Sequence, residues 1–288
     1  MASAQIDWKY AGTLGTIHLL GLLACWPWLF SWSGIALMYF GMHFYGLFGI
    51  DMGYHRLLTH RSFQCPLWLE HCLAVIGMCS AQDAPISWVS THRLHHQESD
   101  EAADPHSPRE SFWWSHVGWL LVKNPKIRCT ATYDRYARDL ISDRFYRRLE
   151  SPLPIAAVYF GHSALYGLAG LLFGGPQLAA SWLIWGVVMR TIGVWHISWA
   201  VNSLTHLWGY RNFETRDDSR NNWVVAFWSV GEGWHNNHHK HPSSASNWYR
   251  WWEVDPVYIA ICAMEKLGLV WGVNRPDFVL TTTPIEGA

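Results

Sequence analysis

Two short histidine motifs constrain the fold of this chain more than any other feature of its sequence. Both have the spacing H-x-x-H-H, and they comprise His92, His95 and His96, and His235, His238 and His239. In a helix, side chains three and four positions apart lie on one face, so each motif brings three imidazoles toward one small volume. One such motif could be a polar helix face. Two of them indicate a metal site that at least two helices build.

The composition indicates that these helices belong to a membrane protein. The chain has 288 residues, of which 50% are hydrophobic and only 15% charged, and 21 are tryptophan. Sparse charge and abundant tryptophan are typical of chains in lipid, where indole rings gather at the level of the headgroups. The formal net charge of −1 argues against nucleic acid as a partner.

Four apolar segments approach the roughly 20 residues that a spanning helix needs. The two loops within the pairs of segments contain no Lys or Arg, and Arg190 is the one basic residue of 21 that falls within a span. Basic residues concentrate on the cytoplasmic side of membrane proteins, which places both termini and the histidines there. We therefore predict an all-α protein of the bacterial cytoplasmic membrane, with a cytoplasmic helical cap. The predicted spans are residues 11–30, 35–50, 152–173 and 177–201, and the cap comprises residues 51–151 and 202–288 of a single domain, residues 1–288.

Further histidines join the two motifs. His55 and His60 lie five positions apart just past the second span, so we expect a helix end there at which the turn loosens. Asn202 and His206 lie four positions apart at the foot of the fourth span. Nine clustered histidines exceed one tetrahedral or octahedral centre and suit two metal ions, and iron, zinc and copper all accept imidazole.

Nearby acidic side chains could orient these imidazoles through their second N–H group. The candidates are Asp51, Asp83, Asp104 and Glu232. Only Glu232-x-x-His235 matches the Glu-x-x-His pattern of carboxylate-bridged di-iron bundles, and the zinc-protease motif H-E-x-x-H is absent from the sequence. Arg190, deep in the fourth span, suggests a structural ion pair or, as the alternative, a contact with substrate.

The three histidine clusters and their flanks resemble those of the membrane-bound fatty acid desaturases. The flanks Gly-Tyr-His-Arg at residues 53–56, Asp-Pro-His-Ser-Pro at residues 104–108 and Gly-Glu-Gly-Trp at residues 231–234 are similar to the Δ9 branch, which includes the stearoyl-CoA desaturases. This resemblance covers nearly the whole chain.

The resemblance implies two iron ions as cofactors and O₂ as co-substrate. It implies nine histidine ligands, with Asn202 reaching one metal through water: His55, His60, His92, His95, His96, His206, His235, His238 and His239. It also implies a bent substrate tunnel, for which we name as candidates Tyr39, Phe40, His43, Phe44 and Arg190.

The activity implied is insertion of a cis double bond, at Δ9, into a carrier-bound saturated acyl chain. The same site could instead make a hydroxylase, an acetylenase or a terminal desaturase, and the carrier could be CoA, acyl carrier protein or a glycerolipid. A separate ferredoxin or cytochrome b5 would supply electrons, and the basic segment from Lys123 to Arg148 could bind that donor or anionic lipid. A histidine-rich membrane protein that only binds metal is the alternative of another class.

Overall fold

The computed structural model describes residues 5–276, and these residues form helices joined by loops, with isolated β-bridges only. Residues 1–4 and 277–288, the two ends of the predicted domain, lie outside the described residues. The prediction of an all-helical protein is thereby confirmed for the part of the chain that the structure describes.

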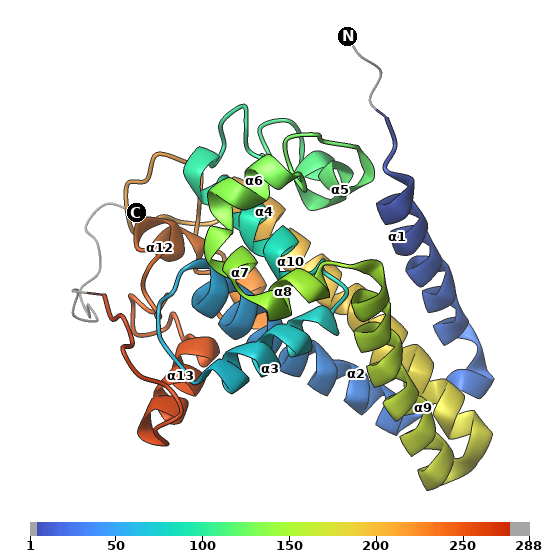
Figure 1. The fold of residues 1–288 in the computed structure, drawn as a ribbon. Helices are drawn as coiled ribbons and strands as arrows, with labels where there is room; N and C mark the ends of the chain where they lie inside the picture. Colours follow the sequence, from blue (N-terminus) through green and yellow to red (C-terminus); the bar gives the residue numbers. More distant parts are fainter. Residues whose placement is uncertain (1–4, 277–288) are drawn as a thin grey trace.

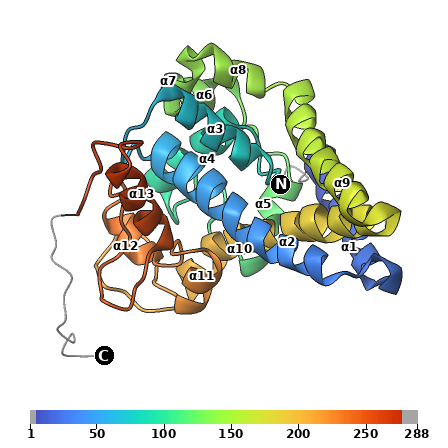
Figure 2. The same cartoon turned by 90° about the horizontal axis from the view of Figure 1, so that it is seen from below.

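Two helical segments, Trp32–Thr59 and Pro152–Leu207, are long and apolar enough to cross a membrane. The second bends back on itself at Gly174 and Gly175, and its two arms lie side by side (Figures 1 and 2). Gly175 has a φ of 75°, a left-handed conformation that a residue without Cβ adopts at little cost. The elements of the two segments are α2 (Trp32–Phe44), η3 (Tyr45–Thr59), α9 (Pro152–Trp182), η5 (Leu183–Met189) and α10 (Arg190–Leu207).

The helices at the first two predicted spans have their own boundaries in the structure. The apolar run at residues 11–30 is interrupted: α1 (Trp8–Gly21) has 14 residues, and short 3₁₀ turns follow it because Pro27 cannot continue a regular helix. The second predicted span, 35–50, lies within a longer helix that continues to Thr59. Its last residues are buried by the cap, so the helix extends beyond the apolar run that marked it in the sequence.

The cap consists of short helices that surround the end of the segment Trp32–Thr59. Buried Tyr54, Leu58, Leu73 and Val89 belong to one apolar core that joins η3 to α3 and α4. The cap helices are α3 (Leu67–Met78), α4 (Pro85–Glu98), η4 (Trp114–Gly118), α5 (Trp119–Leu121), α6 (Thr130–Tyr136), α7 (Arg138–Ser142), α8 (Arg144–Leu149), α11 (Trp223–Trp228), α12 (His235–Lys240) and α13 (Pro256–Lys266).

A buried arginine ties η3 to the segment around α12. Arg56 donates to Glu232 at 2.6 Å and to Asp255 at 2.8 Å, and its Nη1 also donates to the carbonyl of Ala245 at 2.7 Å. The side chains of all three charged residues are at most 5% exposed. Because Asp255 also caps α13, these contacts fix three distant segments of the chain around the histidines.

Arg190 does not form the predicted ion pair. Its guanidinium donates to the carbonyl of Cys79 at 2.7 Å and to Nε2 of His162 at 2.6 Å, and it lies 4.3 Å from the ring centroid of Tyr45. No carboxylate of residues 5–276 lies within 4 Å of it. The cation is stabilised by a carbonyl dipole, an imidazole and an aromatic face, all contributed by neighbouring helices.

Candidate metal centre

The wide turns of η3 bring His55 and His60 together. The backbone N–H of His60 donates to the carbonyl of His55 at 3.1 Å, which is the i to i+5 pattern of a π-helix. A π-turn holds more residues than an α-turn, so side chains five apart return to one face, and the two rings lie 4.8 Å apart between centroids. The predicted loosening of the helix is confirmed.

The nine imidazoles form two sets rather than one set for each motif. The ligand atoms within each set lie within 4.8 Å of one another. The first set is His55, His60, His92, His96 and His238, and the second is His95, His206, His235 and His239.

Each H-x-x-H-H motif is divided between the two sets. On α4, His92 and His96 join the first set, whereas His95 joins the second; on α12, His235 and His239 join the second set, whereas His238 joins the first. In each motif the first and third histidines are four positions apart and point in nearly the same direction along the helix. The second histidine follows the first by three positions, so its side chain points to one side of that direction. The expectation that each motif serves one volume is therefore wrong, and both helices contribute to both sites.

Four carboxylates hold the Nδ1 atoms of four of these imidazoles. Glu232 lies 2.8 Å from His55, and Asp104 lies 3.0 Å from His95, which are the contacts that the predicted role of both acids requires. Two further pairs, Asp100 with His206 at 2.9 Å and Asp217 with His239 at 2.7 Å, were not predicted.

Two of the acids proposed to orient imidazoles, Asp51 and Asp83, make no hydrogen bond to an imidazole in the described part of the chain. The carboxylate of Asp51 faces a cavity instead. Asp83 accepts from Tyr10 at 2.5 Å and pairs with Arg128 at 3.1 Å. Asp100 could have been suspected because it follows the second motif closely, whereas Asp217 lies 22 residues from His239 and carries no such signal.

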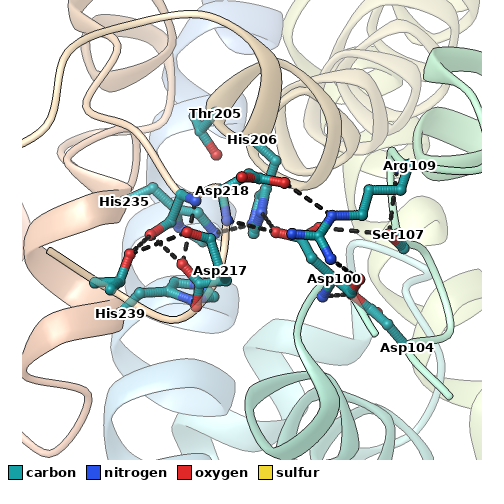
Figure 3. A network of polar contacts seen from close by, with 12 residues as sticks. Asp100, Asp104, Ser107, Arg109, Thr205, His206, Asp217, Asp218, His235 and His239 are labelled. Carbon is teal, nitrogen blue, oxygen red and sulfur yellow. Dashed lines mark hydrogen bonds and ion pairs between the residues drawn. The ribbon is translucent and has the colours of Figure 1, made fainter. Parts of the chain in front are cut away.

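Loops that are distant in sequence share the carboxylate of Asp100 (Figure 3). Besides His206, it accepts from the backbone N–H of Asp218 at 2.7 Å and from the hydroxyl of Ser107 at 3.4 Å. Arg109 donates to the carbonyl of Asp100 and to the carboxylate of Asp218, at 2.8 and 2.9 Å. These bonds hold the carboxylate, and through it the His206 ring, in one orientation.

The protonation of the imidazoles fits two divalent cations. A carboxylate at Nδ1 fixes the ring proton there, which leaves the Nε2 lone pair pointing into the set. Nε2 of His238 lies 3.0 Å from Nε2 of both His55 and His96, and Nε2 of His235 lies 3.1 Å from that of His206. Converging lone pairs at this distance suit a bound cation.

The remaining observations agree with that fit. Burial, together with neighbouring imidazoles, lowers the pKa of His60, His92 and His238 well below the usual value, which favours neutral, metal-binding rings. Nε2 of His60 and Nε2 of His239 are buried and have no hydrogen-bond partner among residues 5–276.

A cavity of about 120 Å³ borders the histidines. His55, His92 and His235 form one part of its wall together with Asn202, and aromatic and aliphatic side chains form most of the rest. Among the latter are Leu14, Trp88, Trp119, Leu120, Trp195 and Trp199.

The five candidate tunnel residues do not line this cavity. Tyr39 and Phe40 are 46% and 64% exposed on the outside of α2, and Nδ1 of His43 bonds to the carbonyl of Tyr39 at 2.8 Å. Phe44 stacks on Phe40, with ring centroids 5.7 Å apart. The tunnel assignment of these residues and of buried Arg190 stays a prediction.

Comparison with known proteins bears on the chemistry of this site. The family model described as fatty acid desaturase matches residues 26–271. An sn-2 palmitoyl-lipid 9-desaturase of Nostoc sp. (strain 36) is 41% identical over 268 residues, which are 93% of this chain and 90% of that protein. An sn-1 stearoyl-lipid 9-desaturase of Anabaena variabilis is 40% identical over 275 residues, 95% of this chain and 96% of that protein.

A third relative is named for another carrier and another bond position than these two. An acyl-CoA 5-desaturase of Anemone leveillei is 40% identical over 266 residues, 92% of this chain and 79% of that protein. The family resemblance of the histidine clusters is thus confirmed over nearly the whole sequence, and the chain belongs to the fatty acid desaturase family, whose members are oxidoreductases of lipid metabolism.

Proposed function

We propose that this protein is an O₂-dependent di-iron desaturase that introduces a cis Δ9 double bond into an acyl chain carried by a membrane glycerolipid. The observation that carries the proposal is the gathering of nine imidazoles in two sets beside an apolar cavity. The carrier and the bond position are proposed by similarity, because two relatives at 40 to 41% identity are named acyl-lipid 9-desaturases.

Each part of the site has a distinct task in this reaction. Two bound iron ions would supply the dioxygen chemistry that removes two hydrogens from an unactivated pair of methylenes, which no side chain acid or base can do. The nine histidines would hold the irons, with Asn202 contributing through water, and Glu232, Asp104, Asp100 and Asp217 would fix the rings.

The cavity would select the carbons that react. Trp88 stacks on His92 with ring centroids 4.8 Å apart, and both line the cavity, so a chain lying along this wall would pass beside the first set. Apolar walls exclude water and hold the acyl chain by burial alone, so the shape of the cavity fixes which methylenes lie nearest the metals.

We further propose that four helices cross the cytoplasmic membrane in two hairpins, with the cap and both termini in the cytoplasm. Exposed apolar side chains on α1, α2 and α9, such as Leu19 (68%), Phe40 (64%) and Leu165 (67%), suit contact with lipid. α1 is short for a span, and its 3₁₀ turns would complete the crossing. Electrons would come from a separate ferredoxin or cytochrome b5, which the basic segment from Lys123 to Arg148 could bind.

The test is the fatty acid profile of a desaturase-deficient host that expresses the chain, with mass spectrometric localisation of double bonds. We expect a new monounsaturated acid on glycerolipids, which His235→Ala abolishes. The matched control is His71→Ala, because His71 belongs to neither set and contacts Asp143 and Phe145. A hydroxylated product would show that the protein is a hydroxylase instead, and a triple-bonded product would show that it is an acetylenase. Absence of any product from a metal-loaded protein with a working electron donor would refute the proposal.

A further inference from the structure

Asp51 stands where two cavities meet. A second cavity, of about 20 Å³, lies beside the one that borders the histidines, and Asp51, Ser198 and Val201 line both. Apolar residues, including Met42 and Val194, line much of the smaller cavity. A carboxylate in such a place needs an explanation, because an acyl chain offers it nothing to bond.

The π-helical turn explains how the carboxylate comes to face this junction. In η3, Gly46, Asp51 and His55 are five and four positions apart, so in a π-helix they lie on one face. A Cβ on Gly46 would lie 3.9 Å from Oδ2 of Asp51, so the carboxylate reaches over a residue that has no side chain.

Asp51 is 9% exposed, and its carboxylate makes no hydrogen bond or ion pair with any of residues 5–276. The cation closest to it in sequence, Arg56, is already paired with Glu232 and Asp255. Burying a charged or polar group without a partner costs several kcal/mol in general, so a bound polar group would stabilise this arrangement.

Two hydroxyl groups complete the polar side of the smaller cavity. Oγ of Ser198 accepts from Nε2 of Gln82 at 2.8 Å, and Oγ of Ser229 accepts from the N–H of Gly233 at 3.0 Å. Neither hydroxyl donates a hydrogen bond within the described residues, so both retain an O–H group to offer. One acceptor and two donors around so small a volume match a single water-sized ligand.

We propose that Asp51, Ser198 and Ser229 form a subsite for one hydroxyl-sized group. A water molecule fills this subsite when the substrate is an unsubstituted chain, and a hydroxyl on the acyl chain fills it when the substrate carries one at the matching position. The acyl-chain part of this inference rests on the proposed function, and it adds hydroxylated acyl chains to the substrate class.

The occupant of the subsite is tested first by a high-resolution structure of the full metal-loaded chain in lipid nanodiscs. We expect density for one water molecule within hydrogen-bond distance of Asp51 and Ser198, and its loss in Asp51→Leu. Hydrocarbon density in the wild-type subsite, or none at all, overturns the inference. This readout does not depend on turnover, so it distinguishes failure of the subsite from failure of the proposed desaturation.

The second arm distinguishes the two sources of the ligand. The desaturase-deficient host is fed a mixture of stearic acid and chain-hydroxylated stearic acids, and the ratio of hydroxylated to plain unsaturated products is measured. For one hydroxyl position we expect a high ratio of hydroxylated to plain unsaturated products in the wild type. Asp51→Leu should lower that ratio about tenfold, and Asp51→Asn should lower it less, because its amide still forms hydrogen bonds. If no hydroxyl position is favoured although the structure shows the water molecule, the ligand of the subsite is water. If the preference for one hydroxyl position is the same in Asp51→Leu as in the wild type, the proposed role of Asp51 is overturned.

Discussion

Oδ2 of Asp217 lies 2.7 Å from Nδ1 of His239, although 22 residues separate the two in sequence. The contact fixes the proton of His239 on Nδ1 and turns its Nε2 lone pair toward the second set. Burial alone would raise the pKa of Asp217, but the bonds from His239 and Ser219 outweigh it and lower that pKa below its usual range. Asp217 is thus an ionised acceptor that orients the imidazole of His239. The sequence spacing of the two residues does not indicate this contact.

Replacing Asp217 by asparagine should weaken metal binding by about 10- to 100-fold, the usual cost of losing an acid behind a metal-bound imidazole. The amide accepts less strongly and no longer favours one tautomer of His239. Metal content after dialysis against graded chelator measures the change. Asp218→Asn is the matched control, because its half-exposed side chain pairs with exposed Arg109 while its backbone N–H still donates to Asp100. Equal losses in both variants would assign the effect to the loop as a whole.

Arg56→Met should destabilise the protein by about 3 to 5 kcal/mol, because it leaves Glu232 and Asp255 buried without a counter-charge. The same change at Arg61, whose side chain is 41% exposed, should cost less than about 1 kcal/mol. Denaturant unfolding in detergent compares the two. Similar costs in both variants would contradict the structural role assigned to Arg56.

Leu14→Trp should abolish or shorten the products without lowering the metal content. Leu14 is 8% exposed and lines the cavity but belongs to neither histidine set, so a larger ring there removes room for the acyl chain without removing a metal ligand. Product analysis and metal analysis on the same preparation separate the two effects. Phe40→Ala is the comparison. Because Phe40 is 64% exposed on the outside of α2, this change should leave the product profile as in the wild type, and a changed chain length would support the tunnel role predicted for Phe40.

The gathering of the nine imidazoles could be predicted because its signals are local. The spacing within α4 and α12, and the loosened turn between His55 and His60, depend on helix geometry alone. The partition of each motif between two sets could not be predicted, since it depends on how α4 and α12 face each other. The same holds for Asp217, whose loop has no periodic pattern and reaches His239 only through the packing of the cap.

The boundaries of the helices could be predicted in part, for a related reason. Hydropathy marks where lipid ends rather than where a helix ends, so it indicates a span at residues 35–50. Only the spacing of His55 and His60 predicted that the helix continues beyond that span, as it does to Thr59 inside the cap. The side chains of Asp51 to Tyr54 are buried by protein there, and their sequence gives little sign of it. Conversely, Pro27 broke an apolar run that composition alone marked as one span.

The stability of the metal-free protein should fall as the pH is lowered from about 6.5 toward 4. Burial lowers the folded-state pKa of five histidines well below 6.5, and that of His239 to about 4: the five are His60, His92, His96, His235 and His238. Between the folded and unfolded pKa values the unfolded chain binds more protons, so acid favours unfolding. Asp104 raises the pKa of His95 despite its burial, and burial raises the pKa of Glu150 to about 7, so these two groups act in the opposite direction.

Bound metal should move this loss of stability to lower pH, because protons must then compete with a cation for the same lone pairs. Thermal unfolding from pH 7.5 to 5, with and without chelator, measures both curves. The double variant His235→Ala/His238→Ala removes two of the buried rings and should give a shallower curve in the chelated protein. A chelated wild type whose unfolding temperature stays level or rises on acidification would show that these imidazoles are already protonated in the fold, which would argue against their role as metal ligands.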